Sequence, residues 1–216
     1  QGLQEIYNLA CPTSAKKFDE HVIDTVLANS IGLKNILDLV LKYQAKFLHL
    51  SSAVVYGPRP NNQIYFKEAD WGSVNSLSPR ACYDEGKRFA ETMVATYAGH
   101  YKKNFKIARV FRTYGPRMML NDGQMIPDFL LAALDNRDLV IYGNENFTTT
   151  LTYVDDIVQG LLKFMDSSLS GALNLGSEES VALVKVAADI ISMSDSKAKI
   201  VFRAAFLFVE EKNLYT

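Results

Sequence analysis

The stretch KFLHLSSAVVYG, residues 46–57, decides the fold class. Its first half is a short apolar run of strand length that ends in two serines, Ser51 and Ser52. Residues 19–43 before it carry apolar side chains at helical spacing, and residues 5–10 have the pattern of another strand. A strand, a long helix and a second strand in this order are typical of a mostly parallel sheet with helices on its faces.

The same alternation continues along the chain. Val54 and Val55 are expected to extend the strand that ends at the serines. Further strands are expected at residues 105–110, 139–142 and 172–175, and helices at 82–101, 125–134, from 155 onward and at 181–192. Residues 57–79 are rich in Pro, Gly and Asn, and a loop of that length is usually functional or disordered.

This pattern predicts an α/β protein with two parts. Residues 1–110 are expected to form a sheet domain that binds a dinucleotide. Residues 111–216 are expected to form mainly a smaller lobe, with some segments returning to the first domain. Because a strand begins almost at once, we expect an N-terminal part of the fold to be missing from the sequence.

Composition excludes several classes of protein. The 216 residues are 48% hydrophobic and 22% charged, as in ordinary globular domains. The net charge is −1 and the basic residues are dispersed, which argues against a nucleic-acid or membrane-surface partner. No run approaches the roughly 20 apolar residues of a membrane-spanning helix, and a signal peptide is not expected. Cys11 and Cys82 suit neither a disulfide framework nor a metal site, so we expect reduced thiols in a cytoplasmic protein.

Tyr83 and Lys87 form the pattern that carries chemistry. They stand four residues apart on a predicted helix, so both side chains leave the same face. A tyrosine with a pKa of about 10 is a poor base at neutral pH, but a nearby ammonium favours the phenolate and lowers that pKa. Ser52, at the end of a strand, would hold the substrate hydroxyl that loses its proton. These groups suit oxidation of an alcohol by a nicotinamide cofactor.

Three segments resemble the extended short-chain dehydrogenase/reductase family. They are SSAVVYG at residues 51–57, CYDEGKR at 82–88 and FRTYGPR at 111–117. Within the family the likeness is strongest to UDP-glucuronate decarboxylases, through NLACP at 8–12, WGSVNSLSPRACYDEGKRFAET at 71–92 and NDG at 121–123. The resemblance implies a Rossmann-type, doubly wound parallel sheet with bound NAD, a C-terminal lobe for a UDP-sugar, and a homodimer.

The resemblance also assigns roles to single residues. Ser52 matches the residue that orients the substrate hydroxyl, Tyr83 the base, and Lys87 the lysine that also holds the nicotinamide ribose. Ala10 and Ser51 join Tyr83 and Lys87 as expected cofactor contacts, and no metal site is implied. Arg112, Arg117 and Tyr142 are the expected substrate contacts. Asn29 matches an asparagine that shapes the site, although an exposed polar residue on a helix explains it equally well.

Two departures concern the cofactor and the proton donor. None of the 12 glycines forms the G-x-x-G-x-x-G turn that binds the cofactor phosphates. We expect that turn to lie in the missing N-terminal part. Val54 stands where the decarboxylases have a glutamate, and Ala53-Val54 where the dehydratases have Asp-Glu. Dehydration therefore lacks an acid and is not expected.

Two further departures concern substrate binding. Arg112 replaces a family asparagine that touches the nucleotide sugar, and Thr149 replaces an arginine that meets the diphosphate. A guanidinium at 112 could bind a phosphate or a sugar carboxylate in bidentate fashion, and Arg117 could also compensate.

Three functions stay open at this point. The first is an NAD-dependent decarboxylase acting on UDP-glucuronate, which the segment 71–92 favours. The second is a UDP-sugar 4-epimerase, which the lost glutamate and arginine favour. The third is a catalytically silent nucleotide-sugar binder, against which the complete Ser52, Tyr83 and Lys87 set argues.

Overall fold

A computed structural model describes residues 2–13, 20–60 and 63–203 and divides the chain into two compact units. Unit 1 contains the described residues of the ranges 1–13, 18–113 and 152–176, and unit 2 those of 114–151 and 177–216. The chain thus leaves unit 1 after Thr113, returns at Thr152 and leaves it again after Gly176.

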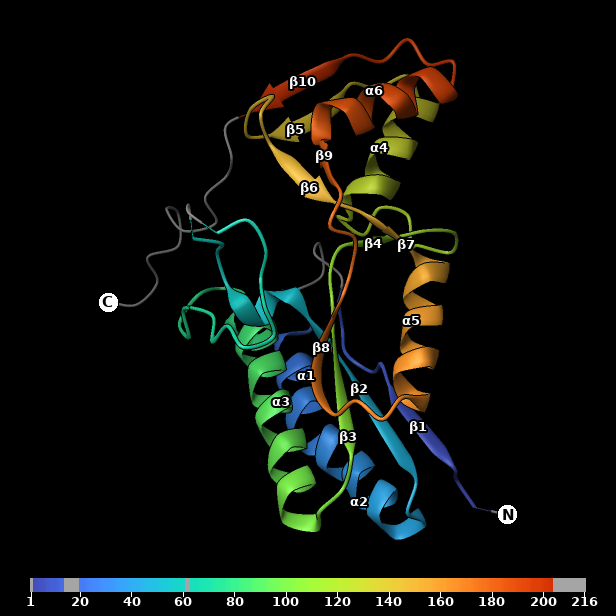
Figure 1. The fold of residues 1–216 in the computed structure, drawn as a ribbon. Coiled ribbons are helices and arrows are strands. Elements are labelled where there is room, and N and C mark those ends of the chain that lie inside the picture. The colour runs from blue at the N-terminus through green and yellow to red at the C-terminus, as the bar shows by residue number, and fades with distance from the viewer. Residues whose placement is uncertain (1, 14–19, 61–62, 204–216) are drawn as a thin grey trace. The chain divides into compact units, whose positions relative to one another are not determined.

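Unit 1 is built on a sheet of four parallel strands (Figure 1). In spatial order they are β1 (Glu5–Asn8), β2 (Lys46–Ser52), β3 (Phe105–Val110) and β8 (Gly171–Leu175). The register sets Asn8 opposite His49, and Ser52 opposite Val110. The carboxyl ends of β2 and β3 therefore meet at one edge of the sheet, where ligands bind in open α/β folds.

Helices cover both faces of this sheet, which confirms the doubly wound parallel fold (Figure 1). One face packs against α1 (Val22–Leu27), α2 (Leu33–Tyr43) and α3 (Ala81–Tyr101), around a core of Leu33, Leu37, Val40, Phe47, Ala90, Val94, Phe105 and Ile107. The other packs against α5 (Val154–Asp166), around Leu48, Ala108, Ile157, Leu161, Phe164 and Met165. Alternate residues of β2 and β3 thus face opposite cores, as strand geometry requires.

Unit 2 has a core of its own. Its helices are α4 (Met125–Leu134) and α6 (Leu183–Met193). β5 (Leu139–Tyr142) pairs in parallel with β10 (Ile200–Arg203), and β6 (Thr148–Thr150) pairs antiparallel with β9 (Ser180–Ala182). Two short strands, β4 (Thr113–Tyr114) and β7 (Thr152–Tyr153), pair where the chain leaves and re-enters unit 1. Phe129, Leu139, Ile141, Leu183 and Ala187 are among the buried residues of the core.

Three expectations about local structure differ from the structure in detail. Val54 and Val55 do not extend the strand, because Ala53–Tyr56 form a 3-10 turn in which the Ser52 hydroxyl accepts from the Val54 amide at 3.4 Å. The helix expected over residues 19–43 contains a π-helical turn at Ala28–Gly32. The helix expected from residue 181 begins at Leu183, because Ser180–Ala182 pair as β9. Residues 204–216 lie outside the described part of the chain.

The turn at Gly57 depends on the absence of a side chain. Gly57 has a φ of 69°, and a Cβ there would lie 1.8 Å from the carbonyl oxygen of Ser73. We expect Gly57→Ala to lower the free energy of unfolding by at least about 2 kcal/mol, since both backbone strain and the collision oppose it. Gly99→Ala in α3 is the matched control, because the added Cβ would meet no described atom within 4 Å beyond its chain neighbours and its own helix backbone. That change should raise stability by about 0.5–1 kcal/mol, and equal effects of the two substitutions in urea unfolding would contradict the expectation.

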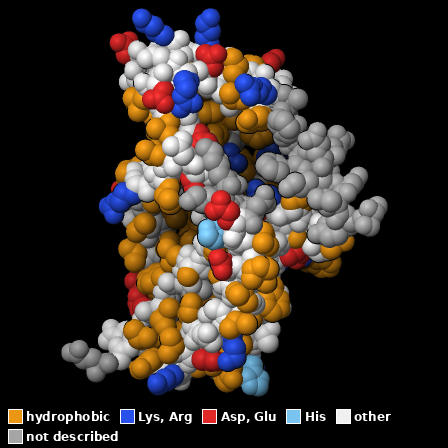
Figure 2. Space-filling model, turned by 180° about the vertical axis from the view of Figure 1, so that it is seen from behind, with side chains coloured by type: hydrophobic (Ala, Val, Ile, Leu, Met, Phe, Trp, Pro, Cys, Tyr) orange, Lys and Arg blue, Asp and Glu red, His pale blue; other side chains and the backbone are white. Residues whose placement is uncertain are grey.

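The surface shows no single-sign patch on the face seen in Figure 2, where basic and acidic side chains are interspersed. Among the described residues, no helix is long and apolar enough to cross a membrane. The same residues contain no group of three or more His, Cys, Asp or Glu side chains placed to hold a metal ion. The cytoplasmic location and the homodimer stay predictions.

Candidate active site

Ser52, Tyr83 and Lys87 meet at the carboxyl end of β2. Ser52 is the last residue of that strand, and Tyr83 and Lys87 lie one turn apart near the start of α3. The Ser52 hydroxyl is hydrogen-bonded to the Tyr83 side chain. The Lys87 Nζ lies 5.9 Å from the centre of the Tyr83 ring. The three side chains that the sequence singled out therefore share one place in unit 1.

The close approach of α3 to the π-helical turn explains the glycine between the two functional residues. A Cβ at Gly86 would lie 3.1 Å from the Asn29 Nδ2, tighter than most contacts of a real side chain. Asn29 is 1% exposed, and its Nδ2 donates to the Thr25 carbonyl at 2.9 Å and to the Cys11 Sγ at 3.2 Å. The interpretation of Asn29 as an exposed helix residue is therefore wrong. π-helical turns of this kind occur often at functional sites.

Lys87 is a buried cation. It is 4% exposed, and its Nζ donates to the Leu50 carbonyl at 2.8 Å. Burial lowers the pKa of Lys87, while Cys11 and the carboxylate of Glu91 act in the opposite direction. A buried ammonium costs stability, which makes Lys87, beside Tyr83, a candidate functional residue.

Burial raises the pKa of Tyr83, and the hydrogen bond with Ser52 only partly offsets this. The expectation that the lysine ammonium would lower that pKa overall is therefore not met in this structure. The reason is geometric, because Lys87 points its Nζ at a backbone carbonyl while protein atoms exclude water from the phenol. The hydrogen bond with Ser52 favours the phenolate most, and the positive charge of Arg80 acts in the same direction.

A buried Asn8–His49 pair supports the end of β1. The Asn8 Oδ1 accepts from the amide of Ala10 at 3.2 Å, so its Nδ2 is the atom that faces the His49 Nδ1 at 3.1 Å. The His49 ring is therefore neutral with its proton on Nε2. Burial lowers the pKa of His49 to about 3, and the charge of Lys87 adds to the effect. The pair fixes the backbone at Ala10, the expected cofactor contact, and sequence reasoning missed both of its members.

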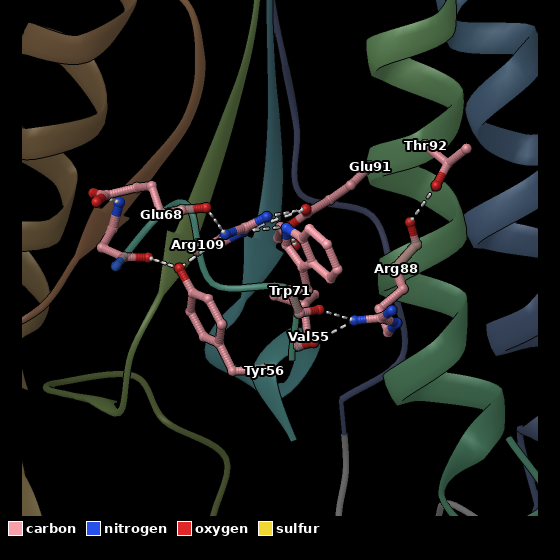
Figure 3. A network of polar contacts seen from close by, with 10 residues as sticks. Val55, Tyr56, Glu68, Trp71, Arg88, Glu91, Thr92 and Arg109 are labelled. Carbon is pink, nitrogen blue, oxygen red and sulfur yellow. Dashed lines mark hydrogen bonds and ion pairs between the residues drawn. The ribbon is translucent and has the colours of Figure 1, made fainter. Parts of the chain in front are cut away.

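Ser51 points into a second polar group. Its hydroxyl donates to the Glu91 Oε1 at 2.6 Å, and Glu91 also binds the guanidinium of Arg109 (Figure 3). Burial alone would lower the pKa of Arg109, but its hydrogen bonds to Glu91 and Tyr56 raise it. The spacing of Tyr83, Lys87 and Glu91 along α3 is a signal that could have identified Glu91, because residues four and eight apart share a helix face.

The expected substrate contacts are divided between the two units. Arg112 lies in unit 1 as an exposed residue, and partial desolvation followed by the charge of Arg80 lowers its pKa. Arg80 also affects the phenol of Tyr83 and forms a 3.6 Å ion pair with Asp84, so sequence reasoning missed a second guanidinium here. Arg117, at a φ of 69°, and Tyr142, which is 52% exposed, belong to unit 2.

A known protein family matches most of this chain. The model of the NAD-dependent epimerase/dehydratase family matches residues 1–176. The chain belongs to this family. The recognition of an extended short-chain dehydrogenase/reductase and the Rossmann-type fold are thereby confirmed, and the family's cofactor is NAD.

Individual relatives show where the likeness is greatest. UDP-glucuronic acid decarboxylase 1 of Danio rerio is 39% identical over 203 residues, which cover 93% of this chain and 47% of that protein. The chain thus spans about half the length of the curated relatives that it matches.

Two solved structures show the same fold. An epimerase from Methanothermobacter thermautotrophicus matches with a TM-score of 0.84 at 23% identity, over 96% of this chain and 61% of the other. UDP-glucuronic acid 4-epimerase from Bacillus cereus, solved with NAD, matches with a TM-score of 0.77 at 23% identity, over 93% of this chain and 63% of the other.

The residues present fit the nicotinamide end of NAD. Tyr83 and Lys87 supply a hydroxyl and an ammonium beside the end of β2, and Ala10 brings a backbone segment to the end of the neighbouring β1. Asn29 adds a buried Oδ1 that has no hydrogen-bond partner among the described residues. This is a polar and partly unsatisfied setting at the strand ends, where a dinucleotide binds in this fold.

Proposed function

We propose that this chain carries the catalytic residues of an NAD-dependent enzyme that modifies a UDP-sugar, beginning with oxidation of the sugar C4 hydroxyl. The observation that carries the proposal is the meeting of Ser52, Tyr83 and Lys87 at the carboxyl end of β2. The 39% identity to a UDP-glucuronic acid decarboxylase supports a nucleotide-sugar substrate.

Each side chain has one task in this proposal. Tyr83 takes the proton of the C4 hydroxyl at its phenolic oxygen, and the Ser52 hydroxyl orients the two oxygens. Lys87 would hold the ribose of the cofactor and contribute positive charge beside the phenolate. NAD, when bound, accepts the two electrons of the oxidation and can later return them.

The fate of the 4-keto sugar decides the product. If the sugar is a uronic acid, the oxidised ring is a β-keto acid, and loss of carbon dioxide leaves an enolate that is protonated on carbon. The alternative is a 4-epimerase, in which the keto-sugar is reduced on its opposite face without loss of carbon. Val54, at the position of the decarboxylase glutamate, favours the epimerase, and the segment 71–92 favours the decarboxylase. We propose the decarboxylase first.

The test is incubation of the full-length protein with UDP-glucuronate and NAD. Release of carbon dioxide with formation of UDP-xylose supports the decarboxylase, and an isomeric uronate supports the epimerase. An absence of turnover despite measurable binding of the nucleotide sugar supports the silent binder and rejects an enzyme acting on this substrate.

Arg112 is the residue that we expect to recognise an anionic part of the substrate. Arg112 lies on the segment that follows β3, close enough to Arg80 for the two positive charges to interact. We expect Arg112→Asn to weaken binding of UDP-glucuronate by about 10- to 100-fold, since a hydrogen bond to a charged group contributes about 1.5–3 kcal/mol. Calorimetric titration measures this, and Arg137→Gln is the control, because Arg137 is an exposed residue of unit 2 whose ion pair is with Asp135. Unchanged affinity in the Arg112 variant would reject the role.

A further inference from the structure

A bidentate ion pair lies beside the candidate site, between β3 and α3. The Arg109 Nη2 donates to the Glu91 Oε2 at 2.7 Å, and its Nε donates to both carboxylate oxygens at 3.0 and 3.2 Å. The two side chains are only 13% and 12% exposed. A charged pair this far from water is tolerated only when its remaining donors and acceptors are also satisfied. Its other contacts therefore show what the pair holds.

The outer edge of the guanidinium binds the segment that precedes α3. The Arg109 Nη1 donates to the Tyr56 hydroxyl at 2.8 Å and to the Glu68 carbonyl at 3.0 Å (Figure 3). The guanidinium carbon also lies 4.8 Å from the centre of the Tyr56 ring. Tyr56 in turn contacts two further residues. Its hydroxyl donates to the Asn174 Oδ1 at 2.7 Å, and its ring stacks on that of Phe66 with the ring centres 4.5 Å apart.

Residues 66–73, which we call the wall segment, are fastened at several further points. Asn174 on β8 donates its Nδ2 to the Phe66 carbonyl and its backbone amide to the Glu68 Oε1. The Trp71 carbonyl accepts from the Arg88 Nη1 at 2.7 Å (Figure 3). The Ser73 amide donates to the Tyr56 carbonyl at 2.9 Å. The wall segment is therefore bound by side chains from β3, β8 and α3, and Arg109 is the one that also holds a buried charge.

The inner edge of the pair reaches the candidate catalytic residues. Glu91 accepts from the Ser51 hydroxyl at 2.6 Å, and Ser51 directly precedes Ser52. Glu91 also lies one helical turn beyond Lys87 on the same face of α3. One buried pair thus connects the strand end that carries Ser52, the helix that carries Tyr83 and Lys87, and the wall segment.

We propose that Glu91 and Arg109 are positioning residues that fix the wall segment against the ends of β2 and β3 and thereby hold Ser52 in place beside Tyr83. The expected effect of this pair on turnover rests on the proposed function, whereas the attachment of the wall segment does not. Residues 66–73, within the turn-rich stretch before α3, then form a fixed wall beside the ends of β2 and β3.

Hydrogen exchange in the full-length protein tests the fastening. In Arg109→Met, we expect amide exchange of residues 66–73 to rise by at least about 10-fold, while amides of β1, β2 and β3 keep their protection. Arg109→Lys keeps the charge but cannot form the fork, so it should restore protection only in part. Asp38→Asn, which breaks the exposed Lys34–Asp38 pair on α2, should change nothing in this segment. Unchanged exchange in the Met variant, or an equal rise throughout unit 1, would overturn the proposal.

Steady-state kinetics tests the positioning. In a full-length protein that turns over a UDP-sugar, Arg109→Met should lower kcat by at least about 10-fold and change KM by less than about 3-fold, since the substrate contacts remain. A larger effect on KM than on kcat would overturn the positioning role. If the wild-type protein shows no turnover, the proposed function fails on its own, and the exchange experiment still decides whether the pair fastens the wall segment.

Discussion

We expect Tyr83→Phe to lower turnover of the full-length protein by at least about 100-fold, the low end of what a positioned acid–base group contributes. The substitution removes the oxygen that we propose takes the substrate proton, while the ring remains. The variant also loses the hydrogen bond between the phenol and Ser52, whose hydroxyl still accepts from the Val54 amide. The free energy of unfolding should change by no more than about 1.5 kcal/mol, the contribution of one hydrogen bond.

Tyr101→Phe is the matched control for this experiment. Tyr101 lies at the last turn of the same helix and is 47% exposed, so loss of its hydroxyl should leave turnover unchanged. The measurement is the initial rate with saturating UDP-sugar and NAD, alongside circular dichroism to show that both variants are folded. A folded Tyr83→Phe protein with a near-normal rate would contradict the role of Tyr83 as the base.

The elements that sequence predicted best are those with uniform local signals. Phe105–Val110 and Met125–Leu134 have the predicted bounds, because an apolar run or a helical period stands between clear breaks. The Ser52, Tyr83 and Lys87 set was predictable for a similar reason. Tyr83 and Lys87 are one helical turn apart, and Ser52 ends a strand that is recognisable as a short apolar run.

The features that sequence did not predict depend on contacts between distant residues. Glu91 and Arg109 are 18 positions apart, and nothing in the sequence around either residue indicates that their opposite charges form a buried pair. Val54 and Val55 have strong strand propensity, but the hydroxyl of Ser52 caps a local turn that overrides it. The sign of the pKa shift of Tyr83 needed the burial of the ring, which spacing along a helix does not give.

Lys87→Met should separate stability from activity. Methionine fills a similar volume without a charge, so the cost of burying the ammonium disappears. We expect the free energy of unfolding at pH 7 to stay within about 1 kcal/mol of the wild-type value or to exceed it, and turnover to fall by at least about 100-fold. Urea unfolding and initial rates measure the two quantities.

We expect Lys106→Met, in the same sheet, to have the opposite effects: lower stability and retained turnover. Lys106 is 3% exposed, and its Nζ donates to the carbonyls of Phe164 and Ser167 at 2.5 and 2.6 Å and to the Ser167 hydroxyl at 3.2 Å. Its replacement removes these three hydrogen bonds at once, so stability should fall by about 1–3 kcal/mol. Lys106 pairs with Leu48, four residues before Ser52, so turnover of the folded protein should be retained.

The pH dependence of the Lys87 variant gives the sharpest check. Burial lowers the pKa of Lys87 below its ordinary value of 10.5, so the unfolded chain holds the proton more tightly than the folded one. The resulting penalty on the wild-type protein is complete below the folded-state pKa and vanishes above 10.5, where the lysine is neutral in both states. The stability of Lys87→Met relative to wild type should therefore be greatest near neutral pH and decline as the pH approaches 10.5. If the relative stability of the variant instead grows with pH, the folded protein prefers the ammonium form of Lys87. The contacts of Lys87 would then stabilise the fold, which would contradict the view that its burial lowers stability for the sake of catalysis.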